Sequence, residues 1–301
     1  MTSGIKKALK YVFIVMSAAV LIVAAFRFWE KYTERKWEKV TERLAAEKLK
    51  GEVNRIQKFI LSIEQIPKNL GYVLEFSRVQ KDHMKLLLNA IVQNNEEVFG
   101  VSIAFEPNTF YKDSVYYAPY AYKRDGKLNY ANPTDSNYHY FSMDWYLIPK
   151  RLNRAVWIEP YFDEGSGGGN IVMSTYSVPF FRFDGQKETM RGIISVDISL
   201  EWLAKMVTSV KLTPGSYALL ISENGNLVCS PGGSISYNES IFSIAEEEHL
   251  PVLREIGRDL QKKNSGFMKV GTIRGVPDCW IAYRPIPANN WGLLLVIPER
   301  K

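Results

Sequence analysis

The most constraining feature of the sequence is an uncharged apolar run that leads without a break into a long helical pattern. The run covers sixteen residues, 11–26, and basic residues flank it on both sides. A membrane-spanning helix needs about 20 residues, and flanking Lys and Arg side chains can make up part of the length by snorkelling. The pattern predicts a transmembrane anchor over 11–28, with a cytoplasmic tail over 1–10. The Val-Ala-Ala at 23–25 leaves a cleaved signal peptide as the alternative.

Apolar residues continue at helical spacing from residue 29 to about residue 63. They form two groups separated by a five-residue step: Trp37, Val40 and Leu44, then Leu49, Val53, Ile56 and Ile60. A helix of this length extends for roughly 50 Å at about 1.5 Å per residue. Such a stripe packs against the rest of its own chain or against a twin helix. We therefore expect a stalk helix with its connection over 29–84, which forms a homodimer.

Downstream of this helix, the apolar period changes to that of strands. A helix is expected over 82–93, further helices over 200–210 and 250–263, and an irregular or helical segment over 144–154. The expected strands are 98–105, 116–123, 128–131, 157–162, 171–181, 191–198, 217–222, 226–230, 267–273, 279–285 and 291–297.

This order of elements predicts an α+β protein. The long N-terminal helix, preceded by one transmembrane helix, would carry two antiparallel-sheet modules with helices beside each sheet. Turn signals at Arg124-Asp125-Gly126 and Glu223-Asn224-Gly225 mark one hairpin in each module. We place the modules at 85–210 and 211–301.

Charged and metal-binding residues are distributed in a way that argues against several classes of function. The formal net charge is +6, but no stripe of Lys and Arg alternates with aromatic residues, so we expect no nucleic-acid partner. His83, His139 and His249 are scattered without metal-ligand spacing, which predicts neither a metal nor a cofactor. No nucleophile and base stand out, so we expect no catalytic residues and no enzymatic activity in this chain. The glycine-rich 165–169 lacks the Lys-Ser/Thr of a phosphate loop and is interpreted as a hairpin tip.

Cys229 and Cys279 are the two cysteines of the chain. Their spacing matches no zinc or redox motif. Because they fall on separate expected strands, we predict two reduced, buried thiols, although an oxidising compartment would permit a bridge between them.

Four segments occur in an order that resembles the membrane-distal module of double Cache sensor domains. In chain order they are Asp144-Trp145-Tyr146, Trp157 to Asp163, Ser174 to Phe180 and Gly192 to Ile198. The turn at Asn224-Gly225 and the closing Trp291-Gly292-Leu293-Leu294 resemble the membrane-proximal module. The resemblance implies two PAS-like modules on one long helix, anchored in the cell inner membrane. It places residues 30–301 outside the cytoplasm and a ligand in the distal module.

The resemblance also implies a ligand site. Positions that match the pocket of amino-acid-binding double Cache domains are occupied by Tyr138, Trp145, Tyr146, Tyr161, Asp163 and Asp197. The arginine that grips a ligand carboxylate in that family falls at Met143, which offers no forked hydrogen bond. The remaining carboxyl groups and aromatic faces suit an ammonium group. Lys150, Arg151 or Arg154 could still replace the arginine, and the aromatic residues could alternatively only fill the core.

Two functions therefore remain open. The first is the extracytoplasmic sensing region of a bacterial transmembrane signalling receptor, with an amine or another small polar metabolite as its ligand. The second is a ligand-free protein-interaction or dimerisation module of such a receptor, which an empty or residue-plugged distal pocket would favour. Ectodomains of this family drive chemoreceptors, sensor kinases and serine phosphatases. Because no output domain is visible here, we expect the sensory part of a longer receptor.

Overall fold

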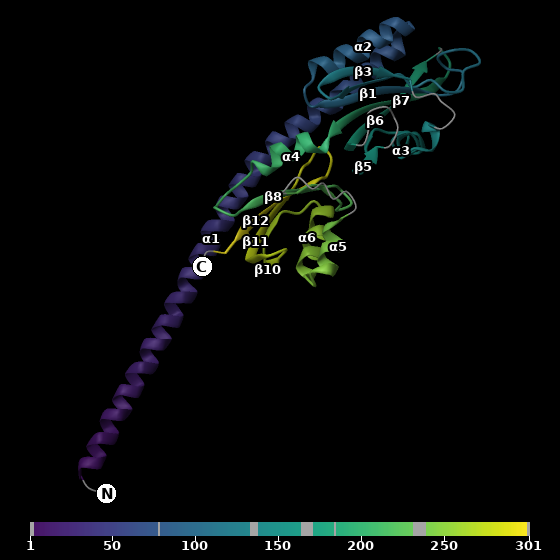
Figure 1. The fold of residues 1–301 in the computed structure, drawn as a ribbon. Coiled ribbons are helices and arrows are strands. Elements are labelled where there is room, and N and C mark those ends of the chain that lie inside the picture. Colours follow the sequence, from purple (N-terminus) through teal and green to yellow (C-terminus); the bar gives the residue numbers. More distant parts are fainter. Residues whose placement is uncertain are drawn as a thin grey trace. The chain divides into compact units, whose positions relative to one another are not determined.

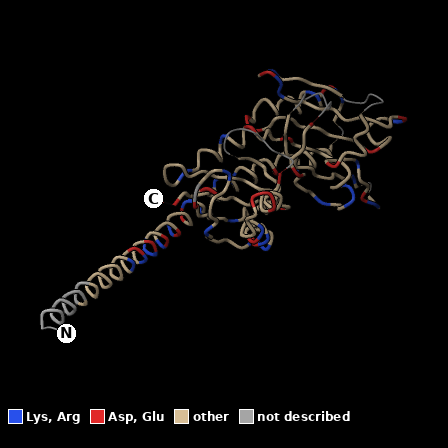
Figure 2. The backbone as a smooth tube through the Cα atoms, turned by 60° about the horizontal axis from the view of Figure 1, so that its bottom comes forward, with Lys and Arg blue, Asp and Glu red and all other residues tan. Residues whose placement is uncertain are grey.

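The computed structural model describes residues 3–77, 79–132, 138–163, 171–183, 185–230 and 239–299 (Figure 1). The chain divides into two units, 1–47 and 48–301, which are described separately. The first unit is helical and consists of the beginning of α1 (Ser3–Phe76). Basic and acidic residues are interspersed along α1 after its apolar run, as the blue and red segments of the tube show (Figure 2).

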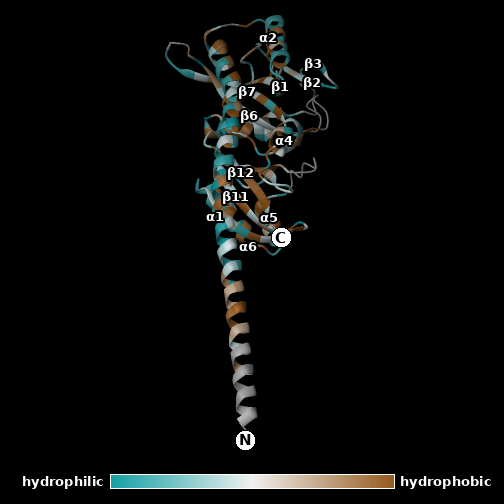
Figure 3. Cartoon of the chain, turned by 90° about the vertical axis from the view of Figure 1, so that its left-hand side faces the viewer, coloured by the Kyte–Doolittle hydropathy of each residue, from teal (hydrophilic) through white to brown (hydrophobic). Residues whose placement is uncertain are grey.

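Two expectations find no support in the fold. A hydrophobic segment of α1 is visible in brown (Figure 3), but within the described residues no helix combines the length and hydropathy of a membrane span. The transmembrane helix expected over 11–28 is therefore not confirmed. The glycine-rich hairpin tip expected over 165–169 lies outside the described residues.

In the second unit, α1 packs an apolar stripe into the core. The stripe consists of Leu49, Val53, Ile56, Ile60, Ile63 and Leu70. The helix was expected to end near residue 63, but it continues through Pro67 to Phe76. Proline removes one intrahelical hydrogen bond, and the burial of Ile63 and Leu70 on either side of Pro67 offsets that loss.

The first sheet has seven antiparallel strands in the order β3-β2-β1-β7-β6-β4, with β5 also paired to β6. Its strands are β1 (Val98–Phe105), β2 (Tyr120–Arg124), β3 (Lys127–Ala131), β4 (Val156–Trp157), β5 (Tyr161–Asp163), β6 (Ile171–Phe183) and β7 (Glu188–Ser199). Helix α2 (Lys81–Asn94) contacts β1, β2 and β3, whereas α3 (Asp144–Leu152) contacts β6 and β7. A short 3-10 helix, η1 (Tyr140–Ser142), precedes α3.

The strand expected over 116–123 begins only at Tyr120. The backbone before it still follows β1, because the carbonyl groups of Tyr117 and Pro119 accept hydrogen bonds from Phe105 and Ile103. Pro119 has no N–H to donate in return, which interrupts the regular ladder at this point.

The second sheet has five antiparallel strands in the order β10-β11-β12-β8-β9. They are β8 (Tyr217–Ile221), β9 (Leu227–Cys229), β10 (Gly266–Ile273), β11 (Val276–Pro285) and β12 (Gly292–Pro298). Three helices accompany them: α4 (Leu200–Thr208), α5 (Ile241–Glu247) and α6 (Pro251–Gln261). The sequence did not predict α5, which begins with a capping box between Ser240 and Ser243. The sequence did not reveal this capping box because the third helical residue of such a box is usually Glu or Gln, whereas here it is Ser243.

Both cysteines are free and buried, as predicted. Cys229 lies on β9 and Cys279 on β11, and the strands β12 and β8 separate them in the sheet. Each sheet falls inside one of the expected modules, since the first spans 98–199 and the second 217–298. The α+β fold with a long N-terminal helix is therefore confirmed.

Candidate functional site

A stripe of polar residues crosses the otherwise apolar middle of the first sheet. Ser102 on β1, Thr175 and Ser177 on β6, and Ser195 and Asp197 on β7 are all buried. Ser195 pairs with both Ser102 and Ser177, and Asp197 pairs with Thr175. Residues that pair across antiparallel strands point to the same face. These five polar side chains therefore share one face, and we call them the polar stripe.

A chain of hydrogen bonds ends at Asp197. The hydroxyl of Thr175 donates to Oδ1 of Asp197 at 2.7 Å, and the hydroxyl of Tyr161 lies 2.8 Å from the same Thr175 oxygen. Because Thr175 has a single hydroxyl hydrogen, Tyr161 must act as the donor to it. Burial raises the pKa of Asp197 to about 7, the bond from Thr175 opposes that rise, and the charge of Asp163 adds to it. Asp197 therefore changes its charge close to neutral pH.

A small inner cavity of about 20 Å³ lies over the polar stripe. It is lined by Ser102, Ala118, Tyr120, Tyr138, Trp145, Tyr161, Asp163, Met173, Ser195 and Asp197. A single water needs roughly 10–15 Å³. The inner cavity as it stands therefore has room for about one water and for no organic ligand.

Tyr120 supplies an unusual polar group to the inner cavity. Its hydroxyl is buried and faces Asp197, but it makes no well-formed hydrogen bond within the described part of the chain. Burial, and next the charge of Asp197, raise the pKa of Tyr120 well above its usual range. The ring lies against Gly100, where a Cβ atom would overlap with it. An orphaned hydroxyl of this kind costs free energy unless a water or a ligand satisfies it.

A larger outer groove of about 530 Å³ adjoins the inner cavity. It is lined by Tyr138, Ser142, Met143, Asp144, Trp145, Ile148, Ile158, Glu159, Pro160, Tyr161, Phe162 and Asp163. Tyr138, Trp145, Tyr161 and Asp163 line both spaces, so they form the partition between them. The indole N–H of Trp145 donates to the Tyr138 hydroxyl at 3.2 Å, which holds the partition together.

The structure brings five of the six residues expected at the site to this place: Tyr138, Trp145, Tyr161, Asp163 and Asp197 line the inner cavity. Tyr146 lines neither space. It is fully buried, packs against the rings of Tyr140 and Phe141, and donates to Glu106 at 2.5 Å. Neighbouring residues of a helix face different directions, and here Trp145 faces the cavity whereas Tyr146 does not.

Among the described residues, no basic side chain lines the site in place of the missing arginine. Met143 lies at the N-terminal end of α3 and lines the outer groove. Lys150 instead pairs with Glu106 at 2.5 Å and lies over the ring of Tyr146. Neither Arg151 nor Arg154 lines the groove or the cavity, and neither lining contains any Lys or Arg. Within the described part of the chain, the two linings hold four acids, Asp144, Glu159, Asp163 and Asp197, and no base, which favours a cation.

Several residues of the site were not predicted from the sequence. They are Ser102, Ala118, Tyr120, Met173, Thr175 and Ser195. A signal for some of them was present, because polar residues at every second position of an otherwise apolar strand indicate a polar patch on one face. Among the described residues, no cluster of three or more His, Cys, Asp or Glu side chains could hold a metal ion.

Sequence comparison identifies the part of the chain that carries the site. Residues 84–205 match the family model of the first PDC sensor domain of methyl-accepting chemotaxis protein-like receptors. This segment is similar to a PDC sensor domain, and we call it the PDC domain. The PDC domain contains the polar stripe, the inner cavity and the outer groove. The resemblance of the sequence to Cache sensor domains is thereby confirmed.

Relatives of known type extend the similarity beyond the PDC domain. The methyl-accepting chemotaxis protein McpC of Bacillus subtilis is 31% identical over 169 residues, which are 52% of this chain and 24% of McpC. The chain thus spans about a quarter of the curated relative that it matches.

Solved structures share the fold. Methyl-accepting chemotaxis protein X has a TM-score of 0.73 at 18% identity, over 88% of this chain and all of that one (100%). The ligand-binding domain of the amino acid chemoreceptor PctC of Pseudomonas aeruginosa PAO1, in complex with GABA, has a TM-score of 0.59 at 18% identity. That match covers 85% of this chain and 99% of the PctC domain.

Proposed function

We propose that this chain is the extracytoplasmic sensing region of a bacterial membrane receptor and that its PDC domain binds a small organic amine. The observation that carries the proposal is the pair of buried carboxyl groups, Asp163 and Asp197, in a lining without Lys or Arg. PctC supports a small ligand with an ammonium group, because GABA has one. GABA also has a carboxylate, for which the present lining offers no cationic partner.

The ligand would occupy the outer groove and direct its ammonium group at the partition. Asp163 lines both spaces and is therefore the first carboxylate that an ammonium group in the groove meets. A charge-assisted hydrogen bond to a carboxylate contributes about 1.5–3 kcal/mol. The rings of Tyr138, Trp145 and Tyr161 can add about 0.5–2 kcal/mol through cation–π contact. To reach Asp197, the ammonium group must displace the partition, so binding requires a local rearrangement.

The segment beside the groove connects the site to two other elements of the second unit. The indole N–H of Trp157, at the start of this segment, donates to Glu64 of α1 at 3.0 Å. Glu159 lines the groove and accepts hydrogen bonds from Asn224 at 2.7 Å and Asn226 at 2.9 Å, at the turn between β8 and β9. A ligand that moves this segment would bias both contacts, by as much as its affinities for the two arrangements differ.

Calorimetry of the 301-residue chain with matched ligand pairs tests the amine preference. The probes are phenethylamine against phenylalanine and isobutylamine against valine. We expect each amine to bind more tightly than its amino acid, and Asp197→Asn to weaken amine binding by about tenfold or more. Cys279→Ser, which replaces a buried residue of the second sheet, is the control and should leave the affinity unchanged. Micromolar binding of an amino acid without binding of its matching amine would refute the proposal.

A ligand-free interaction module is the second candidate, and one observation favours it. Aromatic side chains fill the space over the polar stripe so completely that the inner cavity there holds only about 20 Å³. In addition, Val40 and Leu44 of the helical stripe are 44% and 43% exposed, which suits a homodimer contact along α1. This candidate predicts that no small molecule raises the melting temperature of the chain, whereas a bound amine must raise it.

A further inference from the structure

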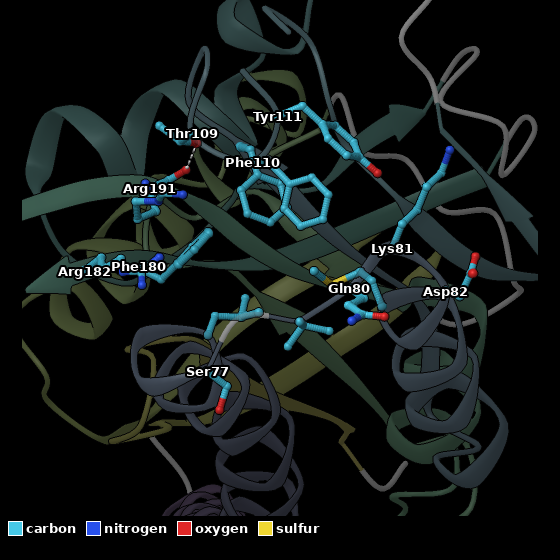
Figure 4. A pocket seen from close by; sticks show the side chains of 14 residues that line it. Ser77, Gln80, Lys81, Asp82, Thr109, Phe110, Tyr111, Phe180, Arg182 and Arg191 are labelled. Atoms are coloured by element: carbon cyan, nitrogen blue, oxygen red, sulfur yellow. Dashed lines mark hydrogen bonds between the residues drawn. The ribbon is translucent and has the colours of Figure 1, made fainter. Parts of the chain in front are cut away.

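A second, larger cavity lies on the opposite face of the first sheet. Its volume is about 670 Å³. It is lined by Leu74, Ser77, Val79, Gln80, Lys81, Asp82, Met84, Phe105, Thr109, Phe110, Tyr111, Phe180, Arg182 and Arg191 (Figure 4). Thr175 and Ser177 of the polar stripe are odd-numbered positions of β6, whereas Phe180 and Arg182 are even-numbered and so face the other way. None of its lining residues belongs to the amine site.

A β-bulge brings a second arginine to this cavity. On the paired strands, Phe180 faces Gly192 and Phe181 faces Met190, so Arg191 is the extra residue of β7. Regular alternation would turn Arg191 away from the face that Phe180 occupies, and a bulge can redirect such a side chain. Arg191 and Arg182 therefore line the same cavity.

The chain fixes this bulge by close backbone contacts. A Cβ atom at position 192 would collide with the carbonyl oxygen of Ala104, so only glycine fits there. The carbonyl oxygen of Arg191 accepts a hydrogen bond from the backbone N–H of Glu106 at 2.8 Å. The Thr109 hydroxyl lies between two carbonyl oxygens, 2.7 Å from that of Glu106 and 3.1 Å from that of Arg191, the latter contact drawn in Figure 4. The bulge and the loop that carries Phe110 are thus held together.

Aromatic rings form the apolar part of the cavity. Phe105 contacts Phe110 with ring centroids 4.7 Å apart and meets Phe180 edge to face at 5.5 Å. Figure 4 shows Phe110 and Phe180 between the two arginines on one side and Lys81 on the other. The wall is completed by the uncapped start of α2, where Gln80 makes no side-chain cap and the first backbone N–H groups lack helical partners.

The charges of the lining favour an anion. Lys81, Arg182 and Arg191 carry three positive charges against the single negative charge of Asp82. Guanidinium groups bind planar carboxylates with paired hydrogen bonds, and the N-terminus of a helix adds further donors. The volume lies within the range of about 300–1,000 Å³ that is typical of small-molecule sites.

We propose that this cavity is a second ligand site, which binds a small aromatic carboxylate. The carboxylate would lie against Arg182 and Arg191, and the ring would pack on Phe105, Phe110 and Phe180. A purely apolar ligand would make no ionic contact with Arg182 and Arg191, and an inorganic anion would make no contact with the aromatic wall. The site is independent of the proposed amine site, which has the opposite charge preference and lies on the other face of the sheet.

Isothermal titration calorimetry of the 301-residue chain tests this second site. The probes are phenylacetate, indole-3-acetate, the neutral phenylacetamide and inorganic phosphate. We expect saturable binding of at least one aromatic carboxylate and much weaker binding of phenylacetamide and phosphate. Arg182→Gln should weaken carboxylate binding by about tenfold, since one charge-assisted contact is lost. Arg258→Gln, an exposed arginine of α6, is the matched control and should have no effect.

Two further variants keep the result independent of folding and of the amine site. Arg191→Lys keeps the positive charge but loses the fork, and should weaken binding less than Arg191→Gln. Asp197→Asn should leave carboxylate binding unchanged. The proposal is overturned if no aromatic carboxylate binds at millimolar concentration, if phenylacetamide binds as tightly as phenylacetate, or if Arg182→Gln and Arg191→Gln leave the affinity unchanged while both variants melt like the parent chain.

Discussion

The two sheets of the second unit differ in the polarity of the side chains that they bury. In the second sheet, the buried residues of β8, β9 and β12 are apolar, and its buried polar residues Ser216, Ser222 and Asn289 lie outside the strands. In the first sheet, the central strands bury the five residues of the polar stripe. Burying polar groups costs stability unless each one is hydrogen-bonded.

The two sheets also differ in the buried polar groups that lack a partner among the described residues. Within the part of the chain that the structure describes, the second sheet leaves the indole N–H of Trp280 on β11 without a partner. The first sheet leaves the hydroxyl of Ser177 without a partner there, and that of Tyr120, beside Asp197, without a well-formed hydrogen bond. Orphaned buried polar groups are uncommon in cores and mark places where a water, an ion or a ligand can bind. On our proposal, the first sheet carries the ligand site and the second sheet supports it.

The largest expected effect comes from the apolar sheet. Ile281 on β11 is fully buried within the core of the second sheet. Ile281→Ala should lower the free energy of unfolding by about 2–5 kcal/mol, because it removes apolar contacts and leaves a cavity. Denaturant unfolding measures this loss. A loss well below this range would mean that the second sheet contributes little to stability, and the comparison would fail.

A smaller effect is expected from pH, through Asp197. Its pKa is about 7 in the folded chain against 3.8 for the ordinary side chain, so the folded state keeps a proton that the unfolded state has lost. The stability contribution of Asp197 is therefore full below its unfolded pKa and declines as the pH rises through its folded pKa. Between about pH 5 and about pH 8 the loss should be about 2–3 kcal/mol.

Asp197→Asn is the matched variant for this pH dependence. The amide has no charge to lose, so the variant should be more stable than the parent chain at neutral pH and above, and nearly equal to it only below the unfolded pKa of 3.8. Unfolding curves at several pH values compare the two proteins directly. Parallel pH profiles for parent and variant would show that Asp197 ionises freely, and the first sheet would then contain no strained acid.

The smallest effect is expected at Ser177. Its buried hydroxyl has no hydrogen-bond partner within the described part of the chain. Ser177→Ala removes that unsatisfied group and should change the free energy of unfolding by at most about 1 kcal/mol, in the stabilising direction. Denaturant unfolding of Ser177→Ala, measured together with Ile281→Ala, tests the difference between the two sheets. A destabilisation of the size expected for Ile281→Ala would show that the hydroxyl is satisfied by an ordered water or another partner.

Much of the fold could be predicted from periodicity. The helical stripe from Leu49 to Ile60 and the strand β1 were found because apolar spacing directly reflects burial. The end of α1 and the start of β2 were missed, because tertiary contacts decide there how a proline is accommodated. The helix α5 was missed, because its cap uses a serine pair that resembles ordinary loop sequence.

The site was predictable only where residue identity matched a known pattern. Asp163 and Asp197 lie 34 positions apart in sequence, and the resemblance to Cache domains, not local spacing, brought them together. Tyr120 could not be assigned, because its place over the polar stripe depends on Gly100 of a neighbouring strand. The small volume of the inner cavity could not be predicted either, because it depends on how Trp145 packs against Tyr138 in the folded chain.

The pH dependence of amine affinity tests the central claim most directly. If an ammonium group binds beside Asp197, the carboxyl must lose its proton first, and calorimetry with phenethylamine should show affinity rising with pH. The account predicts a rise of about tenfold per pH unit from about pH 5 to about pH 7, followed by a plateau. The same titration of Asp197→Asn should be flat. An affinity for the parent chain that is independent of pH, or that falls as pH rises, would contradict the account.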